Sequence, residues 1–213
     1  MDKKNRESLQ KTALFCGLPD ETLEGLLSRG RVRRYARGEV LLRAGDETDA
    51  IGIVLEGTVH LERDDPMGNR ELVGTVTEGE IFGEVFALLP GAPATVTAAA
   101  DTAAAALFLP AAPLLQTPET AMRLTRLIVE KNLALTEKLR HMSRRTTREK
   151  LLSYLAAERE RAKSERFTSA LNRQQLADYL AVDRCAMCRE LSRLRTEGLI
   201  DFDRRQLFFP HGR

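Results

Sequence analysis

The chain contains no tryptophan, and aromatic residues make up only 5% of its 213 residues. Single-stranded nucleic acid is commonly held by bases stacked on aromatic rings, so this scarcity argues against single-strand binding. Three cysteines, an odd number, do not make a disulfide framework. No apolar run approaches the roughly 20 residues of a membrane-spanning helix, and the start, MDKKNRESLQKTALF, lacks the apolar core of a secretory signal. We therefore expect a cytoplasmic protein with no membrane partner.

The remaining composition, 43% apolar and 30% charged residues, is that of an ordinary globular protein of one large domain or two modest ones. Its charge is unevenly distributed. Residues 144–213 hold 16 Lys and Arg against 10 Asp and Glu, a net charge of +6, which leaves −4 for residues 1–143. This asymmetry places a polyanionic partner on the C-terminal part.

Residues 172–198, NRQQLADYLAVDRCAMCRELSRLRTEG, predict two short helices joined by a tight turn. Asn172 with Gln175 three positions later is a capping-box pattern that begins the first helix. Asp183 offers the N-cap of the second helix, and Gly198 supplies its C-terminal stop. The residues expected to face the core recur at helical spacing: Leu176, Ala177 and Leu180, then Met187, Leu191 and Leu194.

A short helix, a three-residue turn and a second helix with an arginine-bearing outer face are typical of a unit that enters the DNA major groove. Residues 199–202 and 207–209 then predict two short strands around a polar turn, a wing whose tip can reach phosphate. The alternative is a unit that only packs, with solvated arginines. The predicted DNA contacts are Arg173, Gln174, Arg184, Cys185, Cys188, Arg189, Ser192, Arg204 and Arg205.

Residues 30–110 differ from the rest, because glycines separate short apolar or alternating runs and turn signals recur every 8–12 residues. This pattern predicts an antiparallel roll or barrel, with a hairpin connection at residues 65–70. Residues 18–27 predict a short helix before it.

A long helix is predicted over about residues 119–142, and alternating spacings of 4 and 3 mark a coiled-coil seam along it. The alternative is a single helix that packs on its own domain. Thr146 with Glu149 forms a second capping box that opens a helix to about residue 163. We expect a sensor at 1–118, a dimerisation helix and hinge at 119–145, and a DNA-binding domain at 146–213. The predicted seam comprises Ala121, Thr125, Ile128, Asn132, Leu135, Leu139 and Met142.

Together these features resemble the Crp/Fnr family of bacterial transcription regulators. The resemblance covers nearly the whole chain and is carried by the 172–198 window and by Gly38, Gly45, Asp46, Gly57 and the GEIFGE segment at residues 79–84. It implies an α+β fold with a cyclic-nucleotide-binding-like antiparallel β-roll, a long dimerisation helix and a C-terminal winged helix–turn–helix. It also implies a homodimer on a palindromic double-stranded DNA operator, with RNA polymerase as a further partner.

The effector pocket that this resemblance implies matches only in part. Gly83 and Glu84 stand where a backbone N–H and a ribose-binding carboxylate are expected, and Thr95 keeps a hydroxyl. The arginine expected to pair with a cyclic phosphate is replaced by Ala94, a loss of about 2–5 kcal/mol for a buried anion. Glu84 can equally have a structural role. The adenine-facing positions fall near Leu135 and Thr136, and the leucine offers no hydrogen bond, so the pattern argues against cyclic AMP.

For other cofactors, the sequence argues against an iron–sulfur cluster but leaves haem open. An iron–sulfur cluster needs about four cysteine ligands, and Cys16, Cys185 and Cys188 are too few. Haem stays open, with His60 and His141 as candidate ligands, although a lone histidine is more often structural. No metal site is predicted, and the cofactor stays unknown.

Cys185 and Cys188 are three apart and share the helix face that would meet DNA bases. They are either small contact residues or a thiol switch. A thioredoxin-like enzyme fits poorly, because no βαβ pattern surrounds the pair.

These sequence features are compatible with two classes of function. The favoured one is a signal-responsive transcription regulator; the other is an effector-binding regulatory subunit whose C-terminal module docks a protein. An enzyme ranks last, because no nucleophile–base pair or metal-ligand set is visible.

Overall fold

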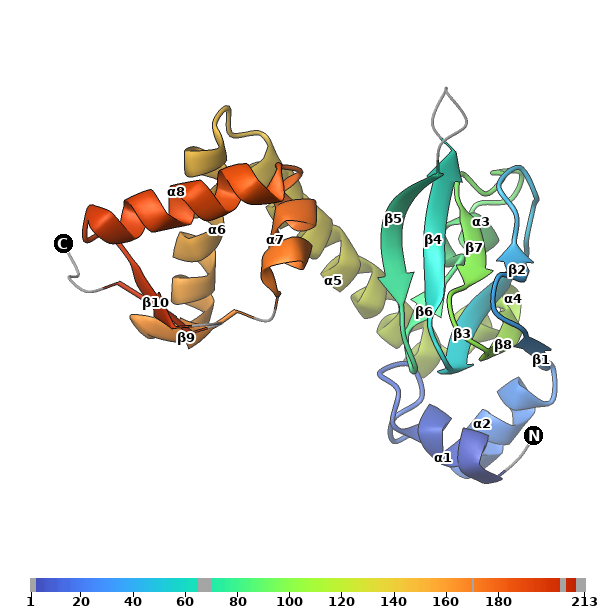
Figure 1. Ribbon diagram of the computed structural model, residues 1–213. Coiled ribbons are helices and arrows are strands. Elements are labelled where there is room, and N and C mark those ends of the chain that lie inside the picture. The colour runs from blue at the N-terminus through green and yellow to red at the C-terminus, as the bar shows by residue number, and fades with distance from the viewer. Residues whose placement is uncertain (1–2, 65–69, 170, 204–205, 210–213) are drawn as a thin grey trace. The chain divides into compact units, whose positions relative to one another are not determined.

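The structure is a computed structural model that describes residues 3–64, 70–169, 171–203 and 206–209. It divides into two compact units, residues 1–128 and 129–213 (Figure 1). Helix α5 (Pro118–Met142) contributes residues to both units. The predicted domain boundaries after residues 118 and 145 remain predictions.

The first unit is the antiparallel roll that the glycine pattern predicts. It consists of two four-stranded sheets with the orders β1-β8-β3-β6 and β2-β7-β4-β5. The hairpin of β4 and β5 pairs Asp64 with Arg70, while residues 65–69 lie outside the described part. The strands are β1 (Arg31–Tyr35), β2 (Val40–Leu42), β3 (Ala50–Glu56), β4 (Val59–Asp64), β5 (Arg70–Val76), β6 (Ile81–Phe82), β7 (Thr97–Ala100) and β8 (Ala104–Pro110).

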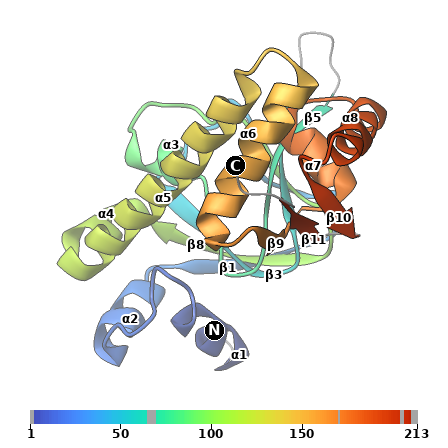
Figure 2. The same ribbon diagram turned by 90° about the vertical axis from the view of Figure 1, so that its left-hand side faces the viewer.

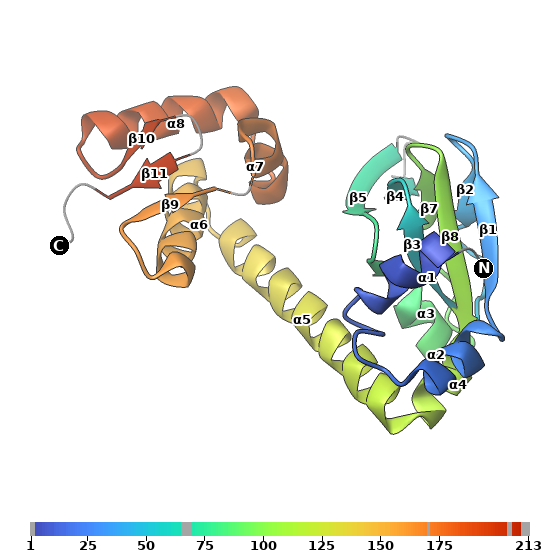
Figure 3. The ribbon, with the colours of Figure 1, turned by 90° about the horizontal axis from the view of Figure 1, so that it is seen from below.

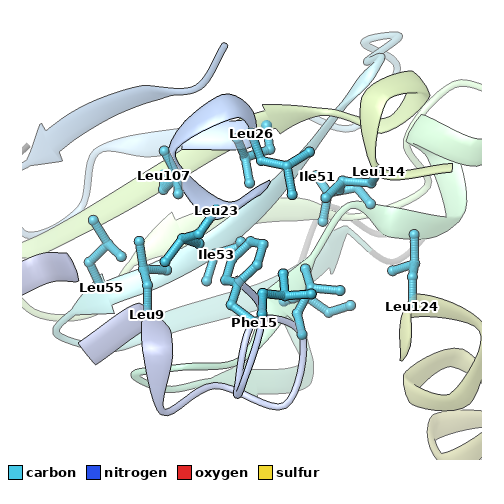
Figure 4. Packing of buried hydrophobic residues seen from close by; sticks show 14 of the residues in the cluster. Leu9, Phe15, Leu23, Leu26, Ile51, Ile53, Leu55, Leu107, Leu114 and Leu124 are labelled. Carbon is cyan, nitrogen blue, oxygen red and sulfur yellow. The ribbon is translucent and has the colours of Figure 1, made fainter. Parts of the chain in front are cut away.

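Helices close one end of this roll. Helices α1 (Lys3–Gln10) and α2 (Asp20–Leu27) lie together at the end of the strands (Figure 1, Figure 2). A cluster of buried side chains joins them to β3, β8, α4 (Ala111–Gln116) and the first turns of α5 (Figure 4). Its labelled members are Leu9, Phe15, Leu23, Leu26, Ile51, Ile53, Leu55, Leu107, Leu114 and Leu124.

A second cluster of buried side chains lies between the two sheets and includes several alanines. Alanines of β7 and β8 pack there with Val54, Val59 and Phe82. A Cβ at Gly52 would lie 2.2 Å from the Phe82 ring, so only glycine lets β3 and this ring come so close. The roll is therefore packed with side chains at this point.

The second unit holds the C-terminal part of α5, α6 (Thr147–Ala162), α7 (Arg173–Leu180) and α8 (Arg184–Thr196). A three-stranded sheet of order β10-β11-β9 completes it (Figure 3). Both predicted capping boxes are confirmed, at Thr146 with Glu149 and at Asn172 with Gln175. The predicted hairpin is confirmed as β10 (Asp201–Asp203) and β11 (Gln206–Phe208), whereas β9 (Arg166–Thr168) was not expected from the sequence.

Candidate nucleic-acid interface

The turn between α7 and α8 is short because a left-handed residue and a local backbone hydrogen bond reverse the chain within a few residues. Ala181 adopts a left-handed conformation with φ of 49°, and Val182 N donates to the carbonyl of Ala177 at 3.0 Å. The Asp183 side chain then accepts from Ala186 N at 2.7 Å and caps α8. These local bonds fix the direction in which α8 leaves the turn.

The inner side of α8 packs on the C-terminal core through the three predicted residues, Met187, Leu191 and Leu194, all buried. Glu190 lies beside them and is only 9% exposed. Its Oε1 accepts from Nη1 of Arg148 on α6 at 3.1 Å.

The same guanidinium also holds the C-terminal end of α8, since Arg148 Nη1 donates to Oε1 of Glu197 at 2.9 Å. Hydrogen bonding to Arg148 lowers the pKa of Glu197 below its ordinary value. Sequence reasoning missed this link between α6 and α8. The available signal was Glu190 itself, a charged residue at a position of the buried stripe.

The outer side of α8 is the predicted DNA-reading face. Arg184, Cys185, Arg189 and Ser192 are exposed there, and Cys188 is half-buried against the core. Within the described part of the chain, neither Arg184 nor Arg189 forms an ion pair with a carboxylate. Two guanidinium groups are therefore available on this face for an anionic partner.

The two predicted contacts on α7 are placed differently. Arg173 is half-buried, with its Cζ 4.9 Å from the ring centre of Phe202 on β10. Arg195 lies 5.0 Å from the same ring centre, and its Nε is 2.7 Å from Oδ1 of Asp201. Burial lowers the pKa of Arg173. The Arg173 guanidinium thus links α7 to the wing strand, a packing role that the sequence did not show.

Gln174 is exposed, and its Nε2 donates to Oδ1 of Asp178 at 2.8 Å. The predicted wing-tip contacts, Arg204 and Arg205, lie outside the described residues.

The candidate effector residues are divided between the two units. Gly83, with φ of 74°, is the N-cap of α3 (Glu84–Leu88), and Glu84 is buried. Thr95 is exposed and follows the buried Ala94, whose backbone pairs with Gly45 and Asp46 at 2.8 Å in both directions. Leu135 and Thr136 are exposed in the other unit.

A cavity of about 640 Å³ opens elsewhere in the first unit, between β1, β2 and the loop that follows β2. It is lined by none of the predicted effector residues. Arginines and carboxylates both line it: Arg29, Arg31, Arg33, Arg43, Asp46, Glu47 and Asp49.

The two candidate haem ligands have protein partners. Nε2 of His60 lies 3.7 Å from Oδ2 of Asp101. His141 is buried, and its Nδ1 lies 2.8 Å from Oγ of Ser153. Across the described residues, no group of three or more His, Cys, Asp or Glu is placed to hold a metal ion. No helix there is both long and apolar enough to cross a membrane.

The predicted seam along α5 is exposed only in part. Thr125, Asn132, Leu135 and Leu139 are exposed, whereas Ala121 and Met142 are half-buried. Ile128 packs against the core of the first unit. Other large apolar side chains of α5 are more open, namely Met122, Val129 and Leu133.

Comparison with known proteins agrees with this architecture. Residues 32–120 match the cyclic nucleotide-binding domain, and residues 149–210 match the Crp-like helix-turn-helix domain. The chain belongs to the Crp/Fnr family. This Crp/Fnr protein is 28% identical to the transcriptional activator protein FnrL of Cereibacter sphaeroides over 185 residues, 79% of this chain and 71% of that one.

Two further relatives cover different shares of the Crp/Fnr chain. The cyclic AMP receptor protein of Thermus thermophilus is 33% identical over 101 residues, 47% of each chain. The crystal structure of DNR from Pseudomonas aeruginosa shares the fold, with a TM-score of 0.53 and 22% identity over 98% of this chain and 95% of that one.

Proposed function

We propose that this Crp/Fnr-type regulator binds a palindromic double-stranded DNA operator as a homodimer and that a signal at the sensor unit controls its DNA affinity. The observation that carries the proposal is the outer face of α8, where Arg184 and Arg189 are exposed without carboxylate partners in the described structure. The inner face is anchored by buried apolar residues and by Arg148. An anchored helix with free guanidinium groups suits both phosphate contact and base reading.

Salt dependence tests DNA binding directly. Binding of a random duplex should weaken steeply as salt rises, with a slope near −0.9 for each phosphate that is neutralised. Arg184→Ala should make the slope shallower by about one unit if this arginine contacts phosphate. A flat salt dependence would instead favour the alternative, a C-terminal module that docks a protein.

The homodimer is proposed on the exposed face of α5. Six exposed positions recur there at alternating spacings of 3 and 4, the pattern of a coiled-coil seam. This register shares Thr125, Asn132 and Leu139 with the seam expected from the sequence. It replaces Ala121, Ile128 and Leu135 by the residues that directly follow them, and it omits Met142. The proposed seam is Met122, Thr125, Val129, Asn132, Thr136 and Leu139.

The signal is proposed to differ from cyclic AMP, although two relatives, one of them the Thermus thermophilus protein, are named for that ligand. Ala94 supplies no guanidinium for a cyclic phosphate, and its backbone is paired with the loop at Gly45 and Asp46. Haem stays open as a cofactor. Purification without oxygen, followed by an absorption spectrum and mass spectrometry of any co-purified small molecule, tests both statements. RNA polymerase as a partner and a cytoplasmic location are proposed from the family alone.

A further inference from the structure

Two thiols lie side by side on the outer face of α8. Cys185 is exposed, Cys188 is half-buried, and both are free. In a helix, Cα atoms three residues apart are about 5 Å from each other, which is within the usual range of about 4.4–6.8 Å for a disulfide. Cys16, the third cysteine, belongs to the other unit.

The surroundings of the pair connect it to the groups that would contact DNA. Arg184 and Arg189 are its direct neighbours in the chain, and both are exposed. Cys188 also interacts electrostatically with Arg173, the residue whose guanidinium packs on Phe202 of the wing. A chemical change at Cys188 therefore acts next to the contact that joins α7 to β10.

We propose that Cys185 and Cys188 form a reversible intramolecular disulfide that weakens operator binding, with a small-molecule disulfide as the oxidant. The proposal rests on the proposed DNA-binding function. The exposed Cys185 thiolate attacks the oxidant, forming a mixed disulfide and releasing one thiolate. Cys188 then loses its proton and attacks the Cys185 sulfur, which releases the second thiolate. The two protein thiols lose two electrons and two protons, and the oxidant is reduced to two thiols.

The geometry of α8 would strain this disulfide, so the bond would be a reversible switch and not a permanent cross-link. A disulfide needs Cβ atoms about 3.8 Å apart, closer than a regular helix holds residues three apart. Met187 is fully buried between the two cysteines, and the Asp183 cap is bound to Ala186, so the first turns of α8 cannot adjust freely. The disulfide must distort the segment that carries Arg184 and Arg189. A strained disulfide is also more readily reduced, which makes the change reversible.

The test compares wild type, Cys185→Ser/Cys188→Ser and the control Cys16→Ser, each reduced with dithiothreitol or treated with glutathione disulfide. Operator binding is measured by fluorescence anisotropy. Trypsin cleavage after Arg184 and Arg189 releases residues 185–189, a peptide that contains both thiols and excludes Cys16. Mass spectrometry of this peptide shows whether the disulfide has formed.

In wild type and in Cys16→Ser, we expect the peptide to become lighter by two hydrogens. We expect operator Kd to rise about tenfold or more, the equivalent of losing one bidentate base contact, and to recover with dithiothreitol. The double variant should have the same operator Kd under both conditions, because serine cannot form the disulfide. A peptide that stays in the dithiol form, or a disulfide that leaves Kd unchanged, overturns the switch while DNA binding stands. Reduced protein that binds no duplex rejects the proposed function, and the switch with it.

Discussion

Nδ1 of His141 lies 2.8 Å from Oγ of Ser153, where the C-terminal end of α5 packs against α6. The imidazole is only 1% exposed. Its ring lies at an angle of 79° to the Tyr154 ring, with 6.0 Å between the ring centres, and it also contacts Tyr179 of α7. Because α7 is the first helix of the DNA-reading motif, this junction joins α5 to that motif within one unit.

The junction predicts a pH-dependent stability. Burial lowers the pKa of His141, as do the positive charges of Arg140, Arg161 and Arg144, while Glu137 opposes them. The unfolded chain therefore takes up this proton at a higher pH than the folded chain does. Stability from the neutral imidazole is complete above the ordinary pKa of about 6.5, and it is lost as pH falls toward the lower, folded-state pKa.

Urea unfolding at about pH 7.5 and about pH 5.5, on either side of the ordinary histidine pKa, checks this sign. Tyrosine fluorescence is a suitable signal, because the chain has no Trp and two of its three Tyr belong to the junction. Wild type should lose more unfolding free energy on acidification than His141→Phe, which keeps a ring but cannot titrate. Carboxylates titrate in both proteins, so equal losses of unfolding free energy would mean that His141 does not contribute to the pH dependence.

Arg189 should read the base edge of a guanine, because a guanidinium can bond two acceptors of that base at once. Arg189→Ala should reduce discrimination between the operator and a mismatched site by about 1–3 kcal/mol. Arg189→Lys should also lose discrimination but keep its affinity for random duplex, since lysine retains the charge without the planar fork. Competition titrations with both duplexes measure this. An equal loss on every duplex would assign Arg189 to phosphate.

The seam along α5 should hold the dimer. Val129 is 59% exposed and Leu139 is 65% exposed, so Val129→Asp/Leu139→Asp leaves the core of each protomer intact. In a dimer, the same change buries four carboxylates in an apolar seam, and sedimentation velocity should therefore detect monomers. Leu72→Asp, at an equally open leucine on β5, is the matched control and should remain dimeric. Dimers of the double variant would place the interface elsewhere.

The cap at Asn172 should stabilise the DNA-reading motif. Its Oδ1 accepts from Gln175 N at 2.9 Å. Asn172→Ala removes that acceptor and should lower the free energy of unfolding by about 1 kcal/mol, whereas Asn172→Ser keeps an acceptor and should cost little. Urea titrations of both variants compare the two. Equal losses would mean that the side chain stabilises the unit by packing and not by capping.

Helix ends and turns of the C-terminal unit were predictable from the sequence, because the partners of a cap lie three residues apart. In both capping boxes, Asn172 with Gln175 and Thr146 with Glu149, the two partners that hydrogen-bond to each other lie within four residues of sequence. The turns of the roll could be predicted from its repeated glycines for the same reason, since the conformation of a turn depends on the backbone freedom of the residues within it. The long helix followed from its spacing of apolar residues.

Other features depended on residues that are far apart in the chain. Alanine favours helices, yet the alanines of β7 and β8 form strands, where they pack with Val54, Val59 and Phe82 between the two sheets.

The C-terminal unit and α5 show the same dependence. Glu190 is buried beside Arg148, and Arg173 packs on Phe202. Ile128 faces the sensor core while Val129 lies open, a difference of one residue that moves the proposed seam. The sequence by itself determined the local elements, their ends and the family. Only tertiary structure decided which faces were buried, because burial depends on contacts that no short segment contains.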